Sequence, residues 1–157
     1  MKKGKIVLGA LLWIFLIALA STSNAMISVK YEDFTLTSSG GETHQLSQYQ
    51  GQSSVLLVFF ATWCPPCIRE VPDLIKLQDK YGDKGLKILA VDIDEPRNLV
   101  EGFIKNKGIN YTVLLDQGAR VAEIYDVRAI PMNILIDKKG EVKYVGHALP
   151  KNIEDVL

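Results

Sequence analysis

Cysteine and histidine are scarce in this sequence, which contains two of each among its 157 residues. The cysteines, Cys64 and Cys67, are three positions apart, so a bridge between them would close only a short ring and stabilise the fold little. The histidines, His44 and His147, do not stand at zinc-finger spacing, and each is expected at the surface of a hairpin. Covalent haem attachment is excluded because Ile68, rather than a histidine, follows Cys67. We therefore expect no metal and no cofactor.

The sequence also lacks an excess of charge of either sign. Eighteen basic residues balance eighteen acidic ones, giving a formal net charge of zero. Without a basic excess there is no electrostatic footprint for nucleic acid, and no nucleic-acid partner is expected. Internal repeats and low-complexity linkers are absent as well, and 48% of the residues are apolar. A single domain with a substantial core is the expected organisation.

The longest apolar run lies at the N-terminus. Residues 1–5 are basic, residues 6–20 are apolar apart from one glycine, and residues 21–25 are small and polar. This pattern is typical of a secretory signal, and the run is shorter than the roughly 20 residues of a spanning helix. We predict a signal peptide over residues 1–25, with an uncleaved inner-membrane anchor as the alternative. Either way residues 26–157 are exported to the periplasm or another extracytoplasmic compartment, and the protein contacts the membrane only if the segment is uncleaved.

Both cysteines lie in the stretch Trp63-Cys64-Pro65-Pro66-Cys67, between an apolar run at 55–60 and a helical pattern at 68–81. A Cys-x-x-Cys pair at a strand-to-helix junction is typical of a redox site. Cys64 is expected at the helix N-terminus, where unpaired N–H groups and the helix dipole stabilise a thiolate. Cys67 lies one turn later, close enough to form a disulfide with Cys64. The two prolines suit the first helical turn.

Periodicity along the rest of the chain predicts an α/β fold. A hairpin with a short turn is expected over residues 31–50, and Ser47 could cap that turn. Strands then alternate with helices before a final hairpin, which predicts a mixed central sheet with helices on both faces. The expected strands are 55–60, 86–93, 111–115, 132–136 and 141–147, and the expected helices are 68–81, 96–107, 119–125 and 150–157.

The sequence from about residue 31 to 157 resembles exported thioredoxin-fold proteins of the TlpA/ResA type. The resemblance is carried by the 63–67 motif, by Glu70 and Pro72 beyond it, and by the segment 125–131. The segment Ile134-Leu135-Ile136-Asp137 and Gly140 follow as in the family. The resemblance implies a thioredoxin fold, here with an N-terminal β-hairpin extension, over residues 26–157.

The resemblance also implies a substrate-binding edge beside the sulfurs. The Ile130-Pro131 bond is expected to be cis and to leave a backbone edge open for a substrate segment near Cys64. Trp63, which precedes the nucleophile, is expected to flank the same site. The pair Met132-Asn133 replaces the small hydroxyl residues common in the family, so we expect a different surface next to the sulfurs.

A second departure concerns the acid that assists proton movement. Ordinary thioredoxins carry a buried aspartate on the central strand, where this chain has Val58. ResA-like proteins instead carry an acid after the next strand, and the matching position is Glu95. A carboxylate in a partly apolar site would have a raised pKa and could serve as a catalytic proton relay. The alternative is that Asp94 and Glu95 only cap and charge-match the helix that begins near Pro96.

The predicted activity is thiol–disulfide exchange outside the cytoplasm, with Cys64 as nucleophile and a Cys64–Cys67 disulfide as product. The resemblance suggests reduction of protein disulfides, with apocytochrome c as the leading substrate and a membrane thiol–disulfide protein as electron donor. A disulfide-donating oxidant and a redox-regulated binding module, docking a partner at Pro131 and Met132, are the alternatives. A thiol peroxidase is disfavoured, since those enzymes resemble a pattern with a lone attacking cysteine between Pro and Thr.

Overall fold

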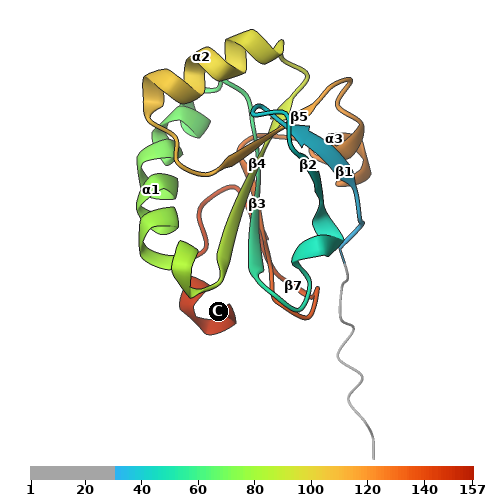
Figure 1. Cartoon of the computed structure of the whole chain (residues 1–157), viewed down its shortest axis with the longest axis vertical. Helices are drawn as coiled ribbons and strands as arrows, with labels where there is room; N and C mark the ends of the chain where they lie inside the picture. Colours follow the sequence, from blue (N-terminus) through green and yellow to red (C-terminus); the bar gives the residue numbers. More distant parts are fainter. Residues whose placement is uncertain (1–30) are drawn as a thin grey trace, which may run out of the picture.

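A computed structural model describes residues 31–157, so the predicted signal peptide or anchor at 1–25 lies outside the described residues. None of the helices within 31–157 is both long and apolar enough to cross a membrane. Figure 1 shows the strands side by side with helices on both sides. The strands are β1 (Thr35–Ser38), β2 (Thr43–Gln45), β3 (Ser54–Phe60), β4 (Leu86–Ile93), β5 (Thr112–Asp116), β6 (Met132–Ile136) and β7 (Val142–Gly146). The α-helices are α1 (Pro65–Tyr81), α2 (Arg97–Lys107) and α3 (Arg120–Ile124), and the 3-10 turns are Leu46–Tyr49, Gly82–Lys84 and Ile153–Val156.

The strands form one mixed sheet in the order β2-β1-β5-β4-β3-β6-β7. Strands β3, β4 and β5 are parallel, and every other neighbouring pair is antiparallel. The N-terminal hairpin β1–β2 extends the sheet beyond β5. The mixed sheet, the flanking helices and the hairpin extension confirm the predicted fold class.

Strand β3 lies inside the sheet, between β4 and β6, and its seven residues, Ser54–Phe60, are all buried. Alternate side chains point to opposite faces of the strand. Leu56, Val58 and Phe60 join a core cluster with residues of α1 and α2, which we call the α1–α2 face. Leu57 and Phe59 join the cluster that includes α3, which we call the α3 face. Burial on both faces explains why the sequence shows a continuous apolar run rather than alternation.

Replacing Phe59 with alanine should destabilise the protein by about 3–5 kcal/mol, because the ring is fully buried and its loss leaves a cavity. The free energy of unfolding from denaturant titration measures the change. Val145→Ala, on the exposed side of β7, is the matched control, with an expected change within about 0.5 kcal/mol. An equally small change for Phe59→Ala would contradict the assignment of Phe59 to the core.

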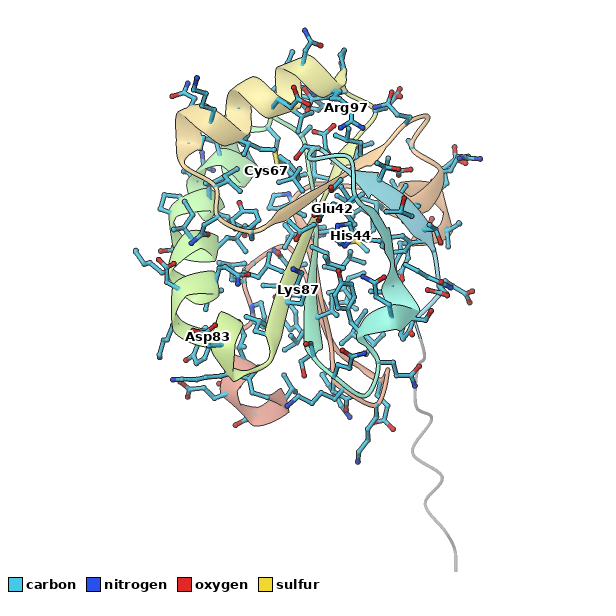
Figure 2. The ribbon with its side chains drawn as sticks, viewed as in Figure 1. Glu42, His44, Cys67, Asp83, Lys87 and Arg97 are labelled. Atoms are coloured by element: carbon cyan, nitrogen blue, oxygen red, sulfur yellow. A yellow bond between two sulfur atoms is a disulfide. The ribbon has the colours of Figure 1, made fainter. Side chains whose placement is uncertain are left out.

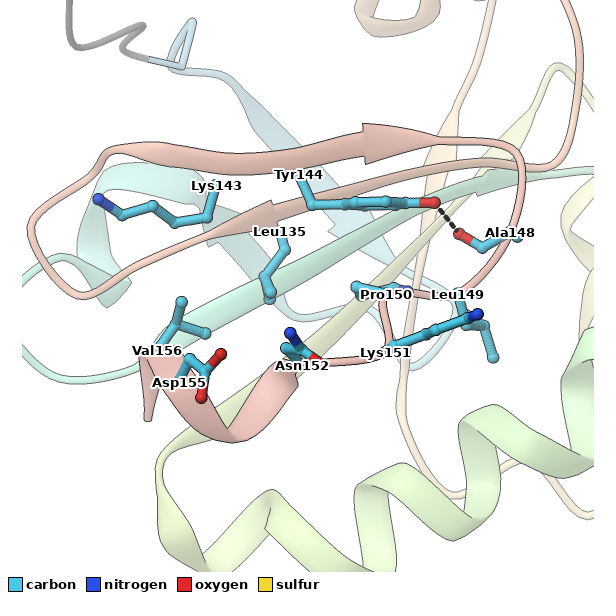
Figure 3. Close-up of a pocket in the computed structure, with 10 residues that line it drawn as sticks. All are labelled: Leu135, Lys143, Tyr144, Ala148, Leu149, Pro150, Lys151, Asn152, Asp155 and Val156. Carbon is cyan, nitrogen blue, oxygen red and sulfur yellow. Dashed lines mark hydrogen bonds between the residues drawn. The ribbon is translucent and has the colours of Figure 1, made fainter. Parts of the chain in front are cut away.

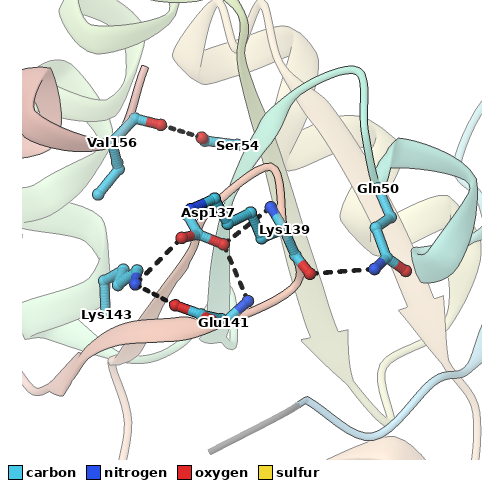
Figure 4. A network of polar contacts seen from close by, with 7 residues as sticks. All are labelled: Gln50, Ser54, Asp137, Lys139, Glu141, Lys143 and Val156. Atoms are coloured by element: carbon cyan, nitrogen blue, oxygen red, sulfur yellow. Dashed lines mark hydrogen bonds and ion pairs between the residues drawn. The ribbon is translucent and has the colours of Figure 1, made fainter. Parts of the chain in front are cut away.

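The hairpin β6–β7 is closed by a polar network around Asp137 (Figure 4). The Asp137 carboxylate accepts hydrogen bonds from the N–H groups of Lys139 and Glu141, both at 2.9 Å. Lys143 Nζ lies 3.1 Å from the other carboxylate oxygen. At the same end of the sheet, the Ser54 hydroxyl donates to the Val156 carbonyl. The contacts of Asp137 fix the turn after β6, the strand that follows Pro131.

Three local predictions are wrong. The helix expected over 150–157 is only the 3-10 turn Ile153–Val156, since so short a segment offers few i→i−4 hydrogen bonds. Ser47 does not cap the turn at 46–49: Gln45 precedes that turn, and the Ser47 N–H donates to Asp33 at 2.8 Å. His44 is not a surface residue but is 8% exposed, with Nδ1 2.7 Å from the Tyr49 hydroxyl. His147 is exposed, as expected.

Candidate active site

The Cys-Pro-Pro-Cys motif joins the end of β3 to the start of α1. Cys64 is the N-cap of α1, and Pro65 and Pro66 occupy the first helical positions. The two cysteines form a disulfide, with their Cα atoms 5.3 Å apart. Figure 2 labels Cys67, which lies at the end of α1 nearest α2. The helix begins before residue 68 because the prolines, which carry no apolar periodicity, form its first turn.

The helix N-terminus provides a hydrogen-bond donor for the nucleophile. The backbone N–H of Cys67 points at the Cys64 sulfur, with N and Sγ 3.3 Å apart. This N–H belongs to the first turn, whose donors have no partner within the helix. After reduction of the disulfide, the donor and the helix dipole stabilise negative charge on Cys64 Sγ. Both cysteines are buried and belong to the core cluster of the α1–α2 face.

The Ile130–Pro131 segment lies beside the sulfurs. The Ile130–Pro131 peptide bond is cis, and the Ile130 carbonyl oxygen is 3.8 Å from Cys64 Sγ. Pro131 immediately precedes β6, which pairs with β3 in antiparallel register. The Pro131 carbonyl is 2.9 Å from His147 Nδ1. The structure therefore brings together three residues that the sequence analysis assigned to one site: Cys64, Ile130 and Pro131.

Trp63 is 70% exposed although it directly precedes the buried Cys64. Large aromatic side chains are usually buried, and an exposed one offers apolar area to a partner. The indole therefore does not shield the sulfurs by packing into the core. It stands at the surface next to the motif, and its binding role remains a prediction.

Glu95 is buried in the loop between β4 and α2 and holds the residue before Trp63. Its carboxylate accepts two hydrogen bonds from Thr62, one from the backbone N–H and one from the hydroxyl, each 2.6 Å long. The capping part of the alternative is wrong, since α2 has Pro96 as N-cap and no side-chain cap. Asp94 instead accepts from the Gly118 N–H at 2.8 Å. Within residues 31–157 no hydrogen bond joins Glu95 to either sulfur, so its link to the cysteines runs through Thr62.

Asp92 is a buried acid that the sequence analysis missed. It is 0% exposed, and its Oδ1 accepts from the Glu95 N–H at 3.3 Å. Burial, followed by the neighbouring Glu95, raises the pKa of Asp92 to about 8. The signal in the sequence is a single carboxylate inside the apolar strand 86–93, where an acid has no obvious partner.

Asn133 is a second polar residue inside the core beside the motif. The pair Met132-Asn133 was expected at the surface next to the sulfurs, and this is wrong because both side chains are buried. The docking groove expected at Pro131 and Met132 therefore has no exposed Met132. Asn133 Nδ2 lies 3.3 and 3.4 Å from the two carboxylate oxygens of Glu70. Burial raises the pKa of Glu70, while the bond from Asn133 lowers it.

A cavity of about 710 Å³ lies away from the motif, between β7 and the C-terminal segment (Figure 3). Neither cysteine lines it. Within residues 31–157 no group of three or more His, Cys, Asp or Glu side chains could hold a metal ion. The cavity is lined by Leu135, Lys143, Tyr144, Ala148, Leu149, Pro150, Lys151, Asn152, Asp155 and Val156.

Comparison with solved structures identifies the fold. A thiol:disulfide interchange protein of the thioredoxin family from Chlorobium tepidum TLS superposes with a TM-score of 0.74 at 22% identity, covering 82% of this chain and 96% of that one. A second Chlorobium tepidum protein, assigned as the thiol:disulfide interchange protein DsbE, is 31% identical with a TM-score of 0.72 and covers 79% and 86%. These likenesses confirm the predicted thioredoxin fold.

Comparison with known sequences identifies the family. Residues 27–145 match the family described as AhpC/TSA. The thiol-disulfide oxidoreductase ResA of Geobacillus kaustophilus is 42% identical over 72% of this chain, and the match spans 64% of that relative's length. ResA of Bacillus cereus is 33% identical over 88% of this chain and 80% of the relative. The chain therefore belongs to the AhpC/TSA family and groups with its thiol-disulfide oxidoreductases of the ResA type.

Proposed function

We propose that this protein is an exported thiol–disulfide oxidoreductase that reduces disulfides in other proteins. The observation that carries the proposal is the position of Cys64. Its sulfur receives the Cys67 N–H and lies 3.8 Å from the Ile130 carbonyl, at the edge where a substrate segment could pair. The proposed nucleophile, Cys64 Sγ, therefore lies next to both a helix N–H donor and the edge that we propose binds the substrate segment. The names of the relatives, ResA and DsbE-type interchange protein, support the same class of reaction.

The reaction is two consecutive thiol–disulfide exchanges. The Cys64 thiolate attacks one sulfur of the substrate disulfide, forming a mixed disulfide and releasing the other substrate sulfur as a thiolate. Cys67 then loses its proton and attacks Cys64 Sγ, which closes Cys64–Cys67 and releases the second substrate thiol. The substrate gains two electrons, and the protein is left in the oxidised state that the structure shows.

An exported reductase needs a source of electrons, because its compartment favours disulfides. We assign this role to a membrane thiol–disulfide protein that reduces Cys64–Cys67. The exposed Trp63 and the Ile130–Pro131 edge would contact the substrate, for which the cysteines of apocytochrome c are our leading candidate. The apolar segment within residues 1–25 supports export to the periplasm, with membrane contact if the segment is retained.

The reduction potential of the Cys64–Cys67 couple tests the direction of transfer. We expect a value well below roughly −220 mV, so that the disulfide is the stable form and the dithiol is a strong reductant. Equilibration with glutathione or a dithiol buffer, followed by quantification of free thiols, gives the potential. A Cys64→Ser variant, which cannot form the couple, is the blank. A value near roughly −120 mV would instead make the protein a disulfide donor and remove the main support for a reductase.

A further inference from the structure

Asp92 lies at the end of β4 on the face that carries the cysteines. In the β3–β4 register it is the partner of Phe60, which belongs to the same core cluster as Cys64 and Cys67. Its side chain is 0% exposed, so water cannot solvate a charge there. Burial of an ionised carboxylate is strongly unfavourable unless it is paired. The partners of Asp92 therefore decide which protonation state it holds.

These partners do not satisfy a charged group. Asp92 Oδ1 accepts the Glu95 N–H, whereas Oδ2 is buried without any hydrogen-bond partner. The ionisable groups that influence Asp92 are Glu95, from the following loop, and Asp116, from β5, and both are acids. The two Asp116 oxygens accept from the N–H groups of Val121 and Ala122, at 3.1 and 2.8 Å. The Asp116 carboxylate thus has donors of its own, and its coulombic effect raises the pKa of Asp92.

Glu95, in contrast to Asp92, has a hydrogen-bond donor for each of its two carboxylate oxygens. Two donors of Thr62 reach its two oxygens at 2.6 Å, a length typical of charge-assisted hydrogen bonds. Each oxygen of an ionised carboxylate can accept more than one hydrogen bond. A protonated Asp92 has one O–H to donate, and the Glu95 carboxylate, whose side-chain hydrogen bond to Asp92 raises the pKa of Asp92, is the acceptor for it. One proton shared by two acids is how close carboxyl pairs avoid a double charge.

We propose that Asp92 is a positioning residue, which stays protonated and shares its proton with Glu95, so that Glu95 remains an anion bound to Thr62. Thr62 is two residues before Cys64, so the pair fixes the loop that carries the nucleophile. The raised pKa of Asp92, about 8, agrees with this arrangement. Above about pH 8 both Asp92 and Glu95 are charged and repel each other, so the hydrogen bonds between Glu95 and Thr62 weaken. The inference rests on the proposed function only in calling Cys64 the nucleophile.

The Thr62 amide resonance of the full-length, oxidised protein tests the proposal. When the wild type is titrated from about pH 6 to about pH 10, we expect this resonance to shift with a midpoint near pH 8. Asp92→Asn supplies a neutral group of the same shape, so the resonance should keep its wild-type, low-pH position throughout. Asp92→Ala, which offers no donor, should move it at all pH values. The matched control is Asp94→Asn, an exposed position in the loop that follows β4, and it should retain the wild-type transition.

Two results would overturn the proposal. One is a wild-type Thr62 resonance whose transition falls below about pH 6, which would mean that Asp92 is ionised at neutral pH and which decides the question even if the Asp92 variants do not fold. The other is displacement of that resonance in Asp92→Asn at about pH 6, which would show that Glu95 needs an ionised Asp92. Turnover of a protein disulfide is measured separately. If the wild-type protein does not turn over a protein disulfide but shows the expected Thr62 transition, the proposed function is contradicted and the role of Asp92 stands.

Discussion

A Cys67→Ala variant should accumulate a covalent mixed disulfide between Cys64 and a protein substrate, and its turnover should fall by several orders of magnitude. The reason is that Cys67 supplies the second sulfur of the exchange. In the structure it is one helical turn from Cys64 and bonded to it, so no other cysteine is needed for release. Without it, the mixed disulfide can leave only by attack of an external thiol. Non-reducing electrophoresis and mass spectrometry of the adduct measure the outcome.

The matched control is Cys64→Ala, in which Cys67 remains but the sulfur at the helix N-cap is lost. This variant should form little adduct, because the nucleophile beside the Ile130 carbonyl is missing. The double variant should form none. Absence of any adduct in Cys67→Ala, with normal binding of a partner, would favour the redox-regulated binding module over the enzyme. An adduct on Cys67 in Cys64→Ala, equal to that in Cys67→Ala, would reverse the assigned roles.

The strands that are buried on both faces could be predicted from the sequence almost to the residue. Leu86–Ile93 and Met132–Ile136 have the predicted bounds, since each is a mostly apolar segment followed by residues that favour turns. Exposed or short elements were less predictable. The segment after Pro150 forms a 3-10 turn because its packing, which the local pattern does not reveal, is limited to Ile153 and a few neighbours.

The residues of the site also differ in how far the sequence predicts them. Cys64 and Cys67 could be predicted because their chemistry is encoded within five consecutive residues. The polar contacts beneath them depend on pairing between distant segments. Asp92 reaches the cysteine face through its register with Phe60, and Asn133 does so through its register with Val58. No periodicity within one segment specifies such a register, so these residues appeared in the sequence as isolated polar positions.

The stability of the oxidised protein should change with pH in a way that isolates Asp92. Its pKa is about 8 in the folded protein and 3.8 for an ordinary aspartate. Between these values the folded state holds a proton that the unfolded state has lost, so the free energy of unfolding falls as pH rises. The contribution of one such proton is at most about 1.4 kcal/mol per pH unit. Below about pH 4 this contribution is fully present, and above about pH 8 it is lost.

Comparison with Asp92→Asn is needed because other groups titrate in the same window. Burial raises the pKa of Glu70, which gives a slope of the same sign, and lowers that of His44, which gives the opposite sign. These contributions cancel in the difference between the variant and the wild type. Asp92→Asn should therefore gain stability relative to the wild type as pH rises, reaching at most about 6 kcal/mol by about pH 9, in denaturant titrations at matched pH.

The exposed Asp94→Asn variant makes the same change of residue type two positions later, in the loop that follows β4, and should keep the pH dependence of the wild type. Asparagine also suits the positive φ of 55° at that position, so the substitution introduces no backbone strain. A pH-independent difference between Asp92→Asn and the wild type would mean that Asp92 is ionised throughout this range. The buried carboxyl pair would then carry two charges, and a cation or another donor outside residues 31–157 would be required to balance them.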